Sequence, residues 1–290
     1  MATSLNNLPD FDKLWNYSKP DETEKQFRTI LDSLQSESTP DYTAQLLTQI
    51  ARCEGLQMKF DKAHKTLDQA EKMINEDMTL PTVRLFLERG RVFNSSGNPT
   101  KSAPLFLKAW EIARDANLDF YAVDAAHMLG IVLEADEALE WNERACQLAE
   151  ASDNQRAKNW LGALYNNIGW TYHSKGDYQT ALDFFQKDEK WYAEREMTTQ
   201  MRIARWSAAK MQRLLGETAI ALATQFELEK ILQAINEQDG YIFEEIAECL
   251  YALGKESKDY FHKAFELLSK DAWLVRDEPQ RLERLNQLGK

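Results

Sequence analysis

The sequence has few residues of the kinds that interrupt helices, and it has no long apolar run. Among its 290 residues only 11 are glycine and 7 are proline, and most of these stand between segments with helical periodicity. This composition predicts a helix-rich chain. No apolar stretch reaches the length of a membrane span, and the N-terminus MATSLNNLPDFDKLW lacks the basic flank and apolar core of a signal peptide. We therefore expect an intracellular, cytoplasmic protein.

Cysteine and histidine are also scarce. The three cysteines, Cys53, Cys146 and Cys249, lie in three different expected helices, and none forms the close pairs that metal sites use. We expect them to be reduced, buried thiols. The four histidines show no paired helical spacing, and no serine or cysteine nucleophile has an identifiable base. The sequence therefore predicts no metal site, no cofactor and no catalytic residues, and we expect that the protein is not an enzyme.

Basic residues are outnumbered by acidic ones. Lysine and arginine total 35 and aspartate and glutamate total 47, so the formal net charge is −12. Proteins that cover nucleic-acid phosphates or anionic lipids usually carry an excess of positive charge. We therefore expect neither nucleic acid nor a membrane as a partner.

The segment from Tyr165 to Trp191 has the clearest internal pattern. Its sequence is YNNIGWTYHSKGDYQTALDFFQKDEKW, and bulky residues recur at helical spacing on both sides of Gly176. The small residues Gly169 and Ala181 would let two helices approach closely. The segment closely resembles a tetratricopeptide repeat, a helical hairpin with the pattern of an aromatic residue, Leu-Gly, Tyr, and then Ala and Phe. Because one hairpin cannot bury its own apolar face, the resemblance implies neighbouring copies.

Small residues that match Gly169 recur along most of the chain. They are Ala51, Gly90, Gly130, Gly169, Ala209 and Ala247, at successive intervals of 39, 40, 39, 40 and 38 residues. A second set of positions lies nineteen residues later in most copies, at Ala70, Ala109, Asp188 and Leu228. The period is longer than the usual 34 residues of this repeat class. We attribute the excess to longer helices and connections.

These registers predict an all-α, right-handed superhelical solenoid of about seven hairpins that resemble tetratricopeptide repeats, in a single domain of residues 1–290. The expected hairpins cover about 9–37, 41–76, 81–116, 119–152, 156–195, 198–236 and 240–269, with the first one divergent, and a C-terminal capping helix lies within about 271–290. Gly130 and Ala145 are separated by fifteen residues instead of nineteen. We therefore expect the fourth hairpin to lack about four residues in its turn.

The family resemblance implies that ligands bind on a concave surface lined by the first helices of successive hairpins. Helical register places ten candidate groove residues there: Arg52, Arg84, Arg91, His127, Asn166, Trp170, His173, Trp206, Lys210 and Arg213. The arginines and lysine could hold ligand carboxylates, and the tryptophans could stack on ligand side chains. The alternative is that Trp170 and Trp206 pack between neighbouring hairpins.

We therefore expect a noncatalytic scaffold or adaptor that binds a protein partner or an extended peptide in this groove, with an acidic peptide as the sharper hypothesis. The alternative is a ligand- or peptide-responsive regulator that switches a partner's activity, like the peptide-sensing helical-repeat response regulators. The identity of the partner and the presence of a homo-oligomer stay open.

Overall fold

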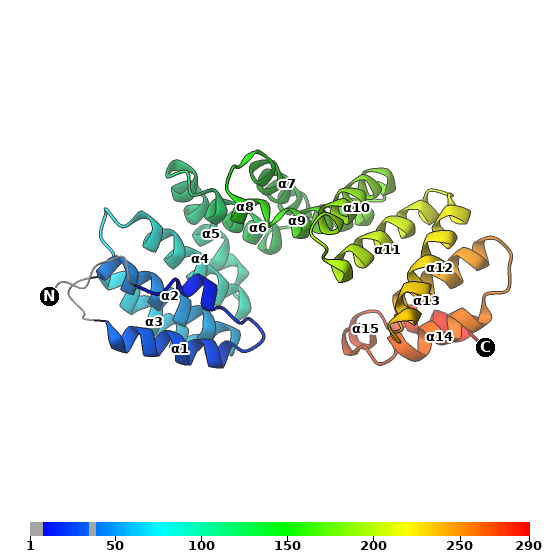
Figure 1. Cartoon of the computed structure of the whole chain (residues 1–290), viewed down its shortest axis with the longest axis horizontal. Coiled ribbons are helices and arrows are strands. Elements are labelled where there is room, and N and C mark those ends of the chain that lie inside the picture. The colour runs from blue at the N-terminus through cyan, green and yellow to red at the C-terminus, as the bar shows by residue number, and fades with distance from the viewer. Residues whose placement is uncertain (1–7, 35–38) are drawn as a thin grey trace. The chain divides into compact units, whose positions relative to one another are not determined.

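The computed structural model describes residues 8–34 and 39–290, and none of these residues lies in a β-strand. Helices follow one another along the chain and are joined by short connections (Figure 1). The chain divides into two compact units, Met1–Leu164 and Tyr165–Lys290, which we call unit 1 and unit 2. The expected end of the first hairpin, at 35–37, lies outside the described residues.

Unit 1 consists of a short 3₁₀ helix followed by α-helices. They are η2 (Phe11–Leu14), α1 (Pro20–Ser33), α2 (Pro40–Leu56), α3 (Phe60–Met73), α4 (Thr79–Ser95), α5 (Pro99–Asp115), α6 (Asp119–Val132), α7 (Ala135–Ala151) and α8 (Gln155–Lys158). Hairpins are formed by α2 with α3, α4 with α5, and α6 with α7. The helices α1, α2 and α5 each begin with a proline, because the first helical position needs no backbone N–H donor.

Unit 2 contains three hairpins and a helical C-terminus. Its helices are α9 (Leu161–Ser174, of which all but the first four residues belong to this unit), α10 (Tyr178–Ala193), α11 (Thr198–Leu214), α12 (Thr218–Ala234), α13 (Gly240–Ala252), α14 (Lys258–Leu268), α15 (Ala272–Asp277) and α16 (Pro279–Leu288). The predicted capping helix corresponds to α16, which begins at Pro279, and a second short helix, α15, precedes it. Leu282 and Leu285 are buried where α16 packs on α14.

The small residues that define the repeat are buried inside the hairpins. A Cβ atom on Gly90 would lie 2.5 Å from the ring of Phe106, and one on Gly169 would lie 2.8 Å from the ring of Phe185. Ala51, Ala209 and Ala247 are fully buried. The prediction that small residues allow the paired helices to approach closely is therefore confirmed.

The fourth hairpin is shorter than the third, but the prediction that its turn lacks about four residues is wrong. Its first helix, α6, has 14 residues, whereas α4 has 17. Most of the missing residues therefore come from the end of the first helix and not from the turn. Asn142 lies against Gly130 where Phe106 and Phe185 lie in the other hairpins, and its side-chain amide donates to the carbonyl oxygen of Ala138 at 3.0 Å.

The three cysteines are buried thiols, as predicted. Burial raises the pKa of Cys53 and of Cys249 to about 12, so both stay protonated at neutral pH. Within the described residues, no helix combines the length and apolarity that a bilayer crossing requires.

A buried aspartate occupies the second-helix position of the fifth hairpin. The side chain of Asp188 on α10 is 2% exposed, and its Oδ1 atom has no hydrogen-bond partner. The equivalent positions Ala70 and Ala109 are fully buried alanines. Burial raises the pKa of Asp188 to about 8, because a charged carboxylate is poorly solvated there.

We predict that Gly90→Ala destabilises the protein, whereas Gly55→Ala does not. Both changes gain helix propensity, but only the first places a Cβ atom within 2.9 Å of three atoms of the Phe106 ring; at Gly55 the nearest atom is 3.4 Å away. Urea unfolding should show a loss of about 1–3 kcal/mol for Gly90→Ala relative to Gly55→Ala. Equal stabilities of the two variants would contradict close packing at Gly90.

We also predict that Asp188→Asn stabilises the protein at pH 7. The folded-state pKa of Asp188 lies above the ordinary value of 3.8, so the folded state holds a proton that the unfolded state releases. The free energy of unfolding of the unchanged protein therefore falls as the pH rises from about 4 to about 8. In the Asp188→Asn variant this contribution is absent, because asparagine does not ionise. Urea unfolding at pH 7 and below pH 4 checks the prediction. The advantage should vanish at the lower pH, and the exposed control Asp183→Asn should show no such dependence.

Candidate functional site

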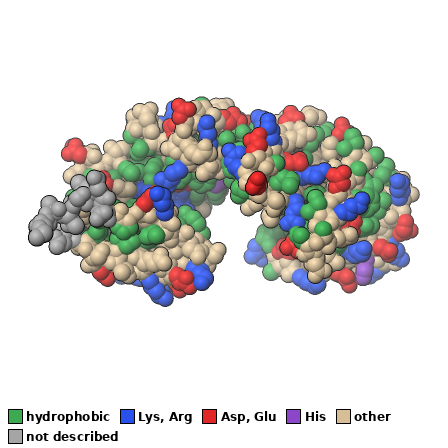
Figure 2. Space-filling view, viewed as in Figure 1, with side chains coloured by type: hydrophobic (Ala, Val, Ile, Leu, Met, Phe, Trp, Pro, Cys, Tyr) green, Lys and Arg blue, Asp and Glu red, His purple; other side chains and the backbone are tan. Residues whose placement is uncertain are grey.

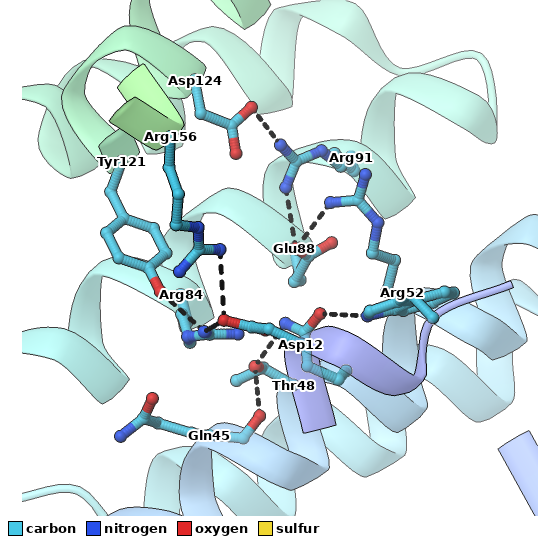
Figure 3. A network of polar contacts seen from close by, with 12 residues as sticks. Asp12, Gln45, Thr48, Arg52, Arg84, Glu88, Arg91, Tyr121, Asp124 and Arg156 are labelled. Atoms are coloured by element: carbon cyan, nitrogen blue, oxygen red, sulfur yellow. Dashed lines mark hydrogen bonds and ion pairs between the residues drawn. The ribbon is translucent and has the colours of Figure 1, made fainter. Parts of the chain in front are cut away.

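The first helices of unit 1 carry a cavity lined by charged and aromatic side chains. Its volume is about 310 Å³, and its walls come from α2, α4, α6, α8 and the N-terminal residues that precede α1. On the face visible in Figure 2, basic and acidic side chains are interspersed over both units, without a broad field of one sign. In the unit-1 cavity, arginine side chains likewise lie beside carboxylates (Figure 3).

Ion pairs connect consecutive first helices in this cavity, and we call them the ion-pair ladder. Arg52 on α2 donates to Glu88 on α4 at 3.0 Å, and Arg91 donates to the same carboxylate at 2.8 Å. Arg91 also donates to Asp124 on α6. The carboxylates of Glu88 and Asp124 are 3% and 5% exposed. Arg52 and Arg91 therefore have carboxylate partners within the protein, which weakens the prediction that they hold a ligand carboxylate.

A second network is centred on Asp12, which precedes the repeats. Arg84 on α4 donates from Nη2 to Asp12 Oδ2 and to the hydroxyl oxygen of Tyr121 on α6, each at 2.6 Å (Figure 3). Arg156 on α8 donates to the same aspartate oxygen at 3.2 Å. Burial raises the pKa of Asp12, but the hydrogen bond and charge of Arg84, together with Arg156, outweigh burial and hold this pKa below its ordinary value. Asp12 is thus an ionised carboxylate held by two arginines.

Residues 9–17, which we call the N-terminal segment, lie across the same cavity. The Trp15 indole N–H donates to Gln49 Oε1 at 3.0 Å. The guanidinium carbon of Arg52 lies 5.4 Å from the ring centroid of Tyr17, a distance at which a cation and an aromatic face attract each other. This segment therefore contacts the inner surface of unit 1 through its side chains.

Unit 2 carries a larger cavity with an aromatic lining. Its volume is about 660 Å³. The rings of Trp170 on α9 and Trp206 on α11 are 5.8 Å apart, and Trp206 is 5.7 Å from the ring of Tyr241 on α13. The Trp206 indole also donates to the carbonyl oxygen of Tyr241 at 3.1 Å. The tryptophans therefore pack between neighbouring hairpins, which is the alternative given by the sequence, and they also line the cavity; their stacking on a ligand stays a prediction. Trp273 on α15 adds a ring that is 51% exposed.

The cations of unit 2 are also paired within the protein. Lys210 and Arg213 on α11 contact opposite oxygens of Glu245 on α13 at 3.0 and 2.7 Å. Glu245 is 1% exposed. Burial raises its pKa, but the charges and hydrogen bonds of Lys210 and Arg213 outweigh burial and hold the pKa of Glu245 below its ordinary value. Arg281 on α16 donates to Glu244 at 2.8 Å in the same way.

The ten candidate groove residues are divided by these observations. Those that line one of the two cavities are Arg52, Arg84, Trp170, His173, Trp206 and Lys210. Arg91 and Arg213 belong to ion pairs beside a cavity. His127 is half-buried with its ring 4.9 Å from that of Trp160, and Asn166 lines neither cavity. That Arg91 shares one surface with Trp170 and Trp206 stays a prediction.

Sequence reasoning missed several residues of both cavities. In unit 1 these are Asp12, Trp15, Tyr17, Tyr121, Arg156 and Trp160, and in unit 2 they are Trp273 and Arg281. The segment that holds Asp12 and Trp15 falls one period before the second hairpin, so the repeat register did point to it. Arg156 and Trp273 lie on short helices outside the repeat, for which the register contains no signal.

No family model matches the chain, and no curated protein matches it. Several solved structures are similar to it. One is a Signal Transduction ATPase with Numerous Domains (STAND) protein with a tetratricopeptide repeat sensor from Pyrococcus horikoshii, with a TM-score of 0.72 and 12% identity over 93% of this chain and 42% of that chain. The apo form of RapI has a TM-score of 0.64 and 12% identity over 93% and 79% of the chains. The apo quorum sensor NprR from B. thuringiensis has a TM-score of 0.61 and 15% identity over 95% and 83%.

These likenesses and the helical hairpins define the class of the protein. It has the all-helical solenoid fold of tetratricopeptide-repeat-like proteins, as predicted. The chain spans less than half the length of the STAND protein.

We predict that Glu245→Gln destabilises unit 2 strongly. The change leaves Lys210 and Arg213 largely buried without their shared carboxylate, which should cost about 3–5 kcal/mol. The control is Glu227→Gln, which removes one of the two carboxylate partners of Arg205 at the exposed surface and should cost less than about 1 kcal/mol. Urea unfolding of both variants measures the difference. Similar losses for the two variants would mean that the buried pairs carry no special weight.

Proposed function

We propose that this protein is a noncatalytic interaction scaffold that binds an extended peptide or a partner segment on the inner surface of its first helices. The observation that supports this proposal best is the aromatic cavity of unit 2. Trp170, Trp206 and Tyr241 come from three successive hairpins, so their rings form a row along the direction in which an extended peptide would lie. Aromatic rings in such a row can each pack on a ligand side chain.

The aromatic rings of the unit-2 cavity, more than its charged side chains, would determine which ligand binds there. Lys210 and Arg281 line this cavity, but each of them already contacts a buried glutamate. Their positive charges are therefore largely neutralised, and they can still donate hydrogen bonds to peptide carbonyl groups. The proposal for unit 2 is thus a peptide with apolar or aromatic side chains, without the preference for acidic residues that the sequence suggested.

The absence of catalysis is part of the same proposal. In the described parts of both cavities the arginines and carboxylates named above are arranged as ion pairs between helices, an arrangement that stabilises the fold and does not activate a nucleophile. The rigid inner surface would let a peptide bind without rearrangement of the scaffold.

A regulatory role is the second candidate function. Two proteins with this fold are described as sensors, the quorum sensor NprR and the STAND protein with a tetratricopeptide repeat sensor. In such a role the bound peptide would change the activity of a partner that binds elsewhere on the chain. An effect of the peptide on the affinity for that partner would favour the regulator over the passive scaffold.

Selection from a peptide library displayed on phage tests the proposed function. Peptides enriched on the full chain are labelled with fluorescein, and their dissociation constants are measured by fluorescence anisotropy. We predict that Trp273→Ala weakens binding by about tenfold or more, because an exposed aromatic wall of the cavity is lost.

Val275→Ala is the matched control. Val275 lies on the same helix α15 and is 51% exposed, the same as Trp273, but it does not line the cavity. This variant should bind the peptides as the unchanged protein does. The proposal is refuted if no peptide is enriched, or if Trp273→Ala and His173→Ala bind every enriched peptide with unchanged affinity.

A further inference from the structure

The N-terminal segment, residues 9–17, contacts unit 1 in the manner of a bound peptide. Its side chains reach three helices: Trp15 contacts Gln49 on α2, and Asp12 contacts Arg84 on α4 and Arg156 on α8. Phe11 is 6% exposed and packs edge-on against Phe27 and Tyr42, with ring centroids 6.2 and 5.2 Å away. The hydroxyl group of Tyr42 donates to the carbonyl oxygen of Pro9 at 2.8 Å. Phe11 is therefore an apolar contact point of the segment, whereas Asp12 and Trp15 make polar contacts.

The polar anchors follow Phe11 at short intervals. Asp12 accepts hydrogen bonds from Arg84 and Arg156, and three residues later Trp15 donates to Gln49. The ring of Trp15 is stacked on that of Tyr17 at 4.7 Å. The segment thus presents an aromatic residue, an acid, a second aromatic residue three positions after the acid, and a third aromatic residue two positions after that.

The segment leaves part of the site unused. A second cavity of about 540 Å³ is lined by Asp12 and Arg84 as well, so Asp12 lies between two empty volumes. Arg84 is only 5% exposed, and its buried Nε atom has no hydrogen-bond partner. One carboxylate oxygen of Glu88 is likewise buried without a partner. Buried polar atoms without partners are rare in a surface that has evolved only to pack. Neither atom is exposed while the segment is in place, so only a ligand that replaces the segment could bond them.

The charges of the site favour an acidic ligand once the segment is removed. The residues of Figure 3 include the four arginines Arg52, Arg84, Arg91 and Arg156, and the three carboxylates Asp12, Glu88 and Asp124. Only Asp12 belongs to the N-terminal segment. Without it, four positive charges face two negative ones, and Arg84 and Arg156 both lose the carboxylate that they share.

We propose that the unit-1 cavity is a second peptide-binding site, and that its partner is a segment of another protein in which an acid lies next to one aromatic residue and three positions before another. Residues 9–17 of this chain hold the site as a resident ligand that such a partner displaces. The inference rests on the proposed function, but it concerns a different site. Partner binding then requires release of the chain's own segment, so the resident lowers the apparent affinity for the partner.

The test uses full-length chains in which the resident segment is weakened. The variant carries Asp12→Lys and Trp15→Ala, and the probe is a fluorescein-labelled synthetic peptide with the sequence LPDFDKLWNYS of residues 8–18. Fluorescence anisotropy should show that the variant binds this peptide at least about tenfold more tightly than the unchanged chain, because the competing resident is removed. A probe in which lysine replaces the aspartate of FDK should lose about tenfold or more in affinity.

Two controls identify the site. Lys13→Ala changes an exposed side chain of the same segment and should leave the affinity of the unchanged chain as it is. Adding Arg84→Gln to the weakened variant should abolish probe binding. A peptide library selected on the weakened variant should be enriched in sequences with an acid beside an aromatic residue.

Hydrogen exchange of the unchanged chain covers the case in which the weakened variant does not fold. At saturating concentrations of isotope-labelled probe, the amides of residues 10–17 should exchange faster, because the probe displaces the resident segment. The inference is overturned if a folded variant binds the probe no better than the unchanged chain, or if exchange in these residues is unaffected. A dimer formed by exchange of N-terminal segments between copies would also overturn it, since the site would then belong to a second copy of this chain. None of these outcomes alters the result expected for Trp273→Ala in unit 2.

Discussion

The close approach of the two helices in a hairpin depends on a residue without a bulky side chain where the helices meet. Gly90 accommodates Phe106 in this way, and Gly169 accommodates Phe185. Where the glycine is replaced by alanine, as at Ala51 and Ala209, the alanine is fully buried. These contacts fix the distance between the paired helices, and the regular interval between them stacks one hairpin on the next. The first helices of successive hairpins consequently lie side by side and present a common inner surface within each unit.

Stacking brings charged residues of consecutive first helices together, and most of the inner-surface cations serve this purpose. Arg52 and Arg91 share Glu88, and Lys210 and Arg213 share Glu245. The carboxylates of these pairs are only 3% and 1% exposed, so an unpaired charge there would be poorly solvated. Each carboxylate is therefore stable only while its cations remain bound to it. The ladder therefore holds neighbouring hairpins in register, and it leaves aromatic rings and a few arginines for contacts with a ligand.

The repeat was predictable from sequence because it depends on local spacing. The intervals between Ala51, Gly90 and Gly130 follow directly from the length of a hairpin, and so does the helical character of the chain. The charge of the groove was not predictable from the same register. A count of cations on one helix face does not include carboxylates contributed by the next helix. The register chose Arg52 and Arg91 as cations for a ligand and missed that Glu88 accepts hydrogen bonds from both.

The partner of Arg84 illustrates a second limit of sequence reasoning. Asp12 lies 72 residues earlier in the chain, on a 3₁₀ helix of four residues, and the pairing depends on how an irregular segment lies across the repeats. No periodicity describes such a path. The same holds for Arg156, which lies on the short helix α8 between two repeats. The register reached Asp12, one period before Ala51, but it did not describe how residues 9–17 cross the first helices.

The central proposal is that a peptide binds on the inner surface of the first helices. A crystal structure of the full chain with a library-selected peptide tests this claim most directly. We expect the peptide to lie along the first helices, either with its side chains between the rings of Trp170, Trp206 and Tyr241, or with a carboxylate on Arg84 and Arg156 in place of Asp12. A peptide bound instead to the outward faces of the second helices, such as α5 or α12, would contradict the account.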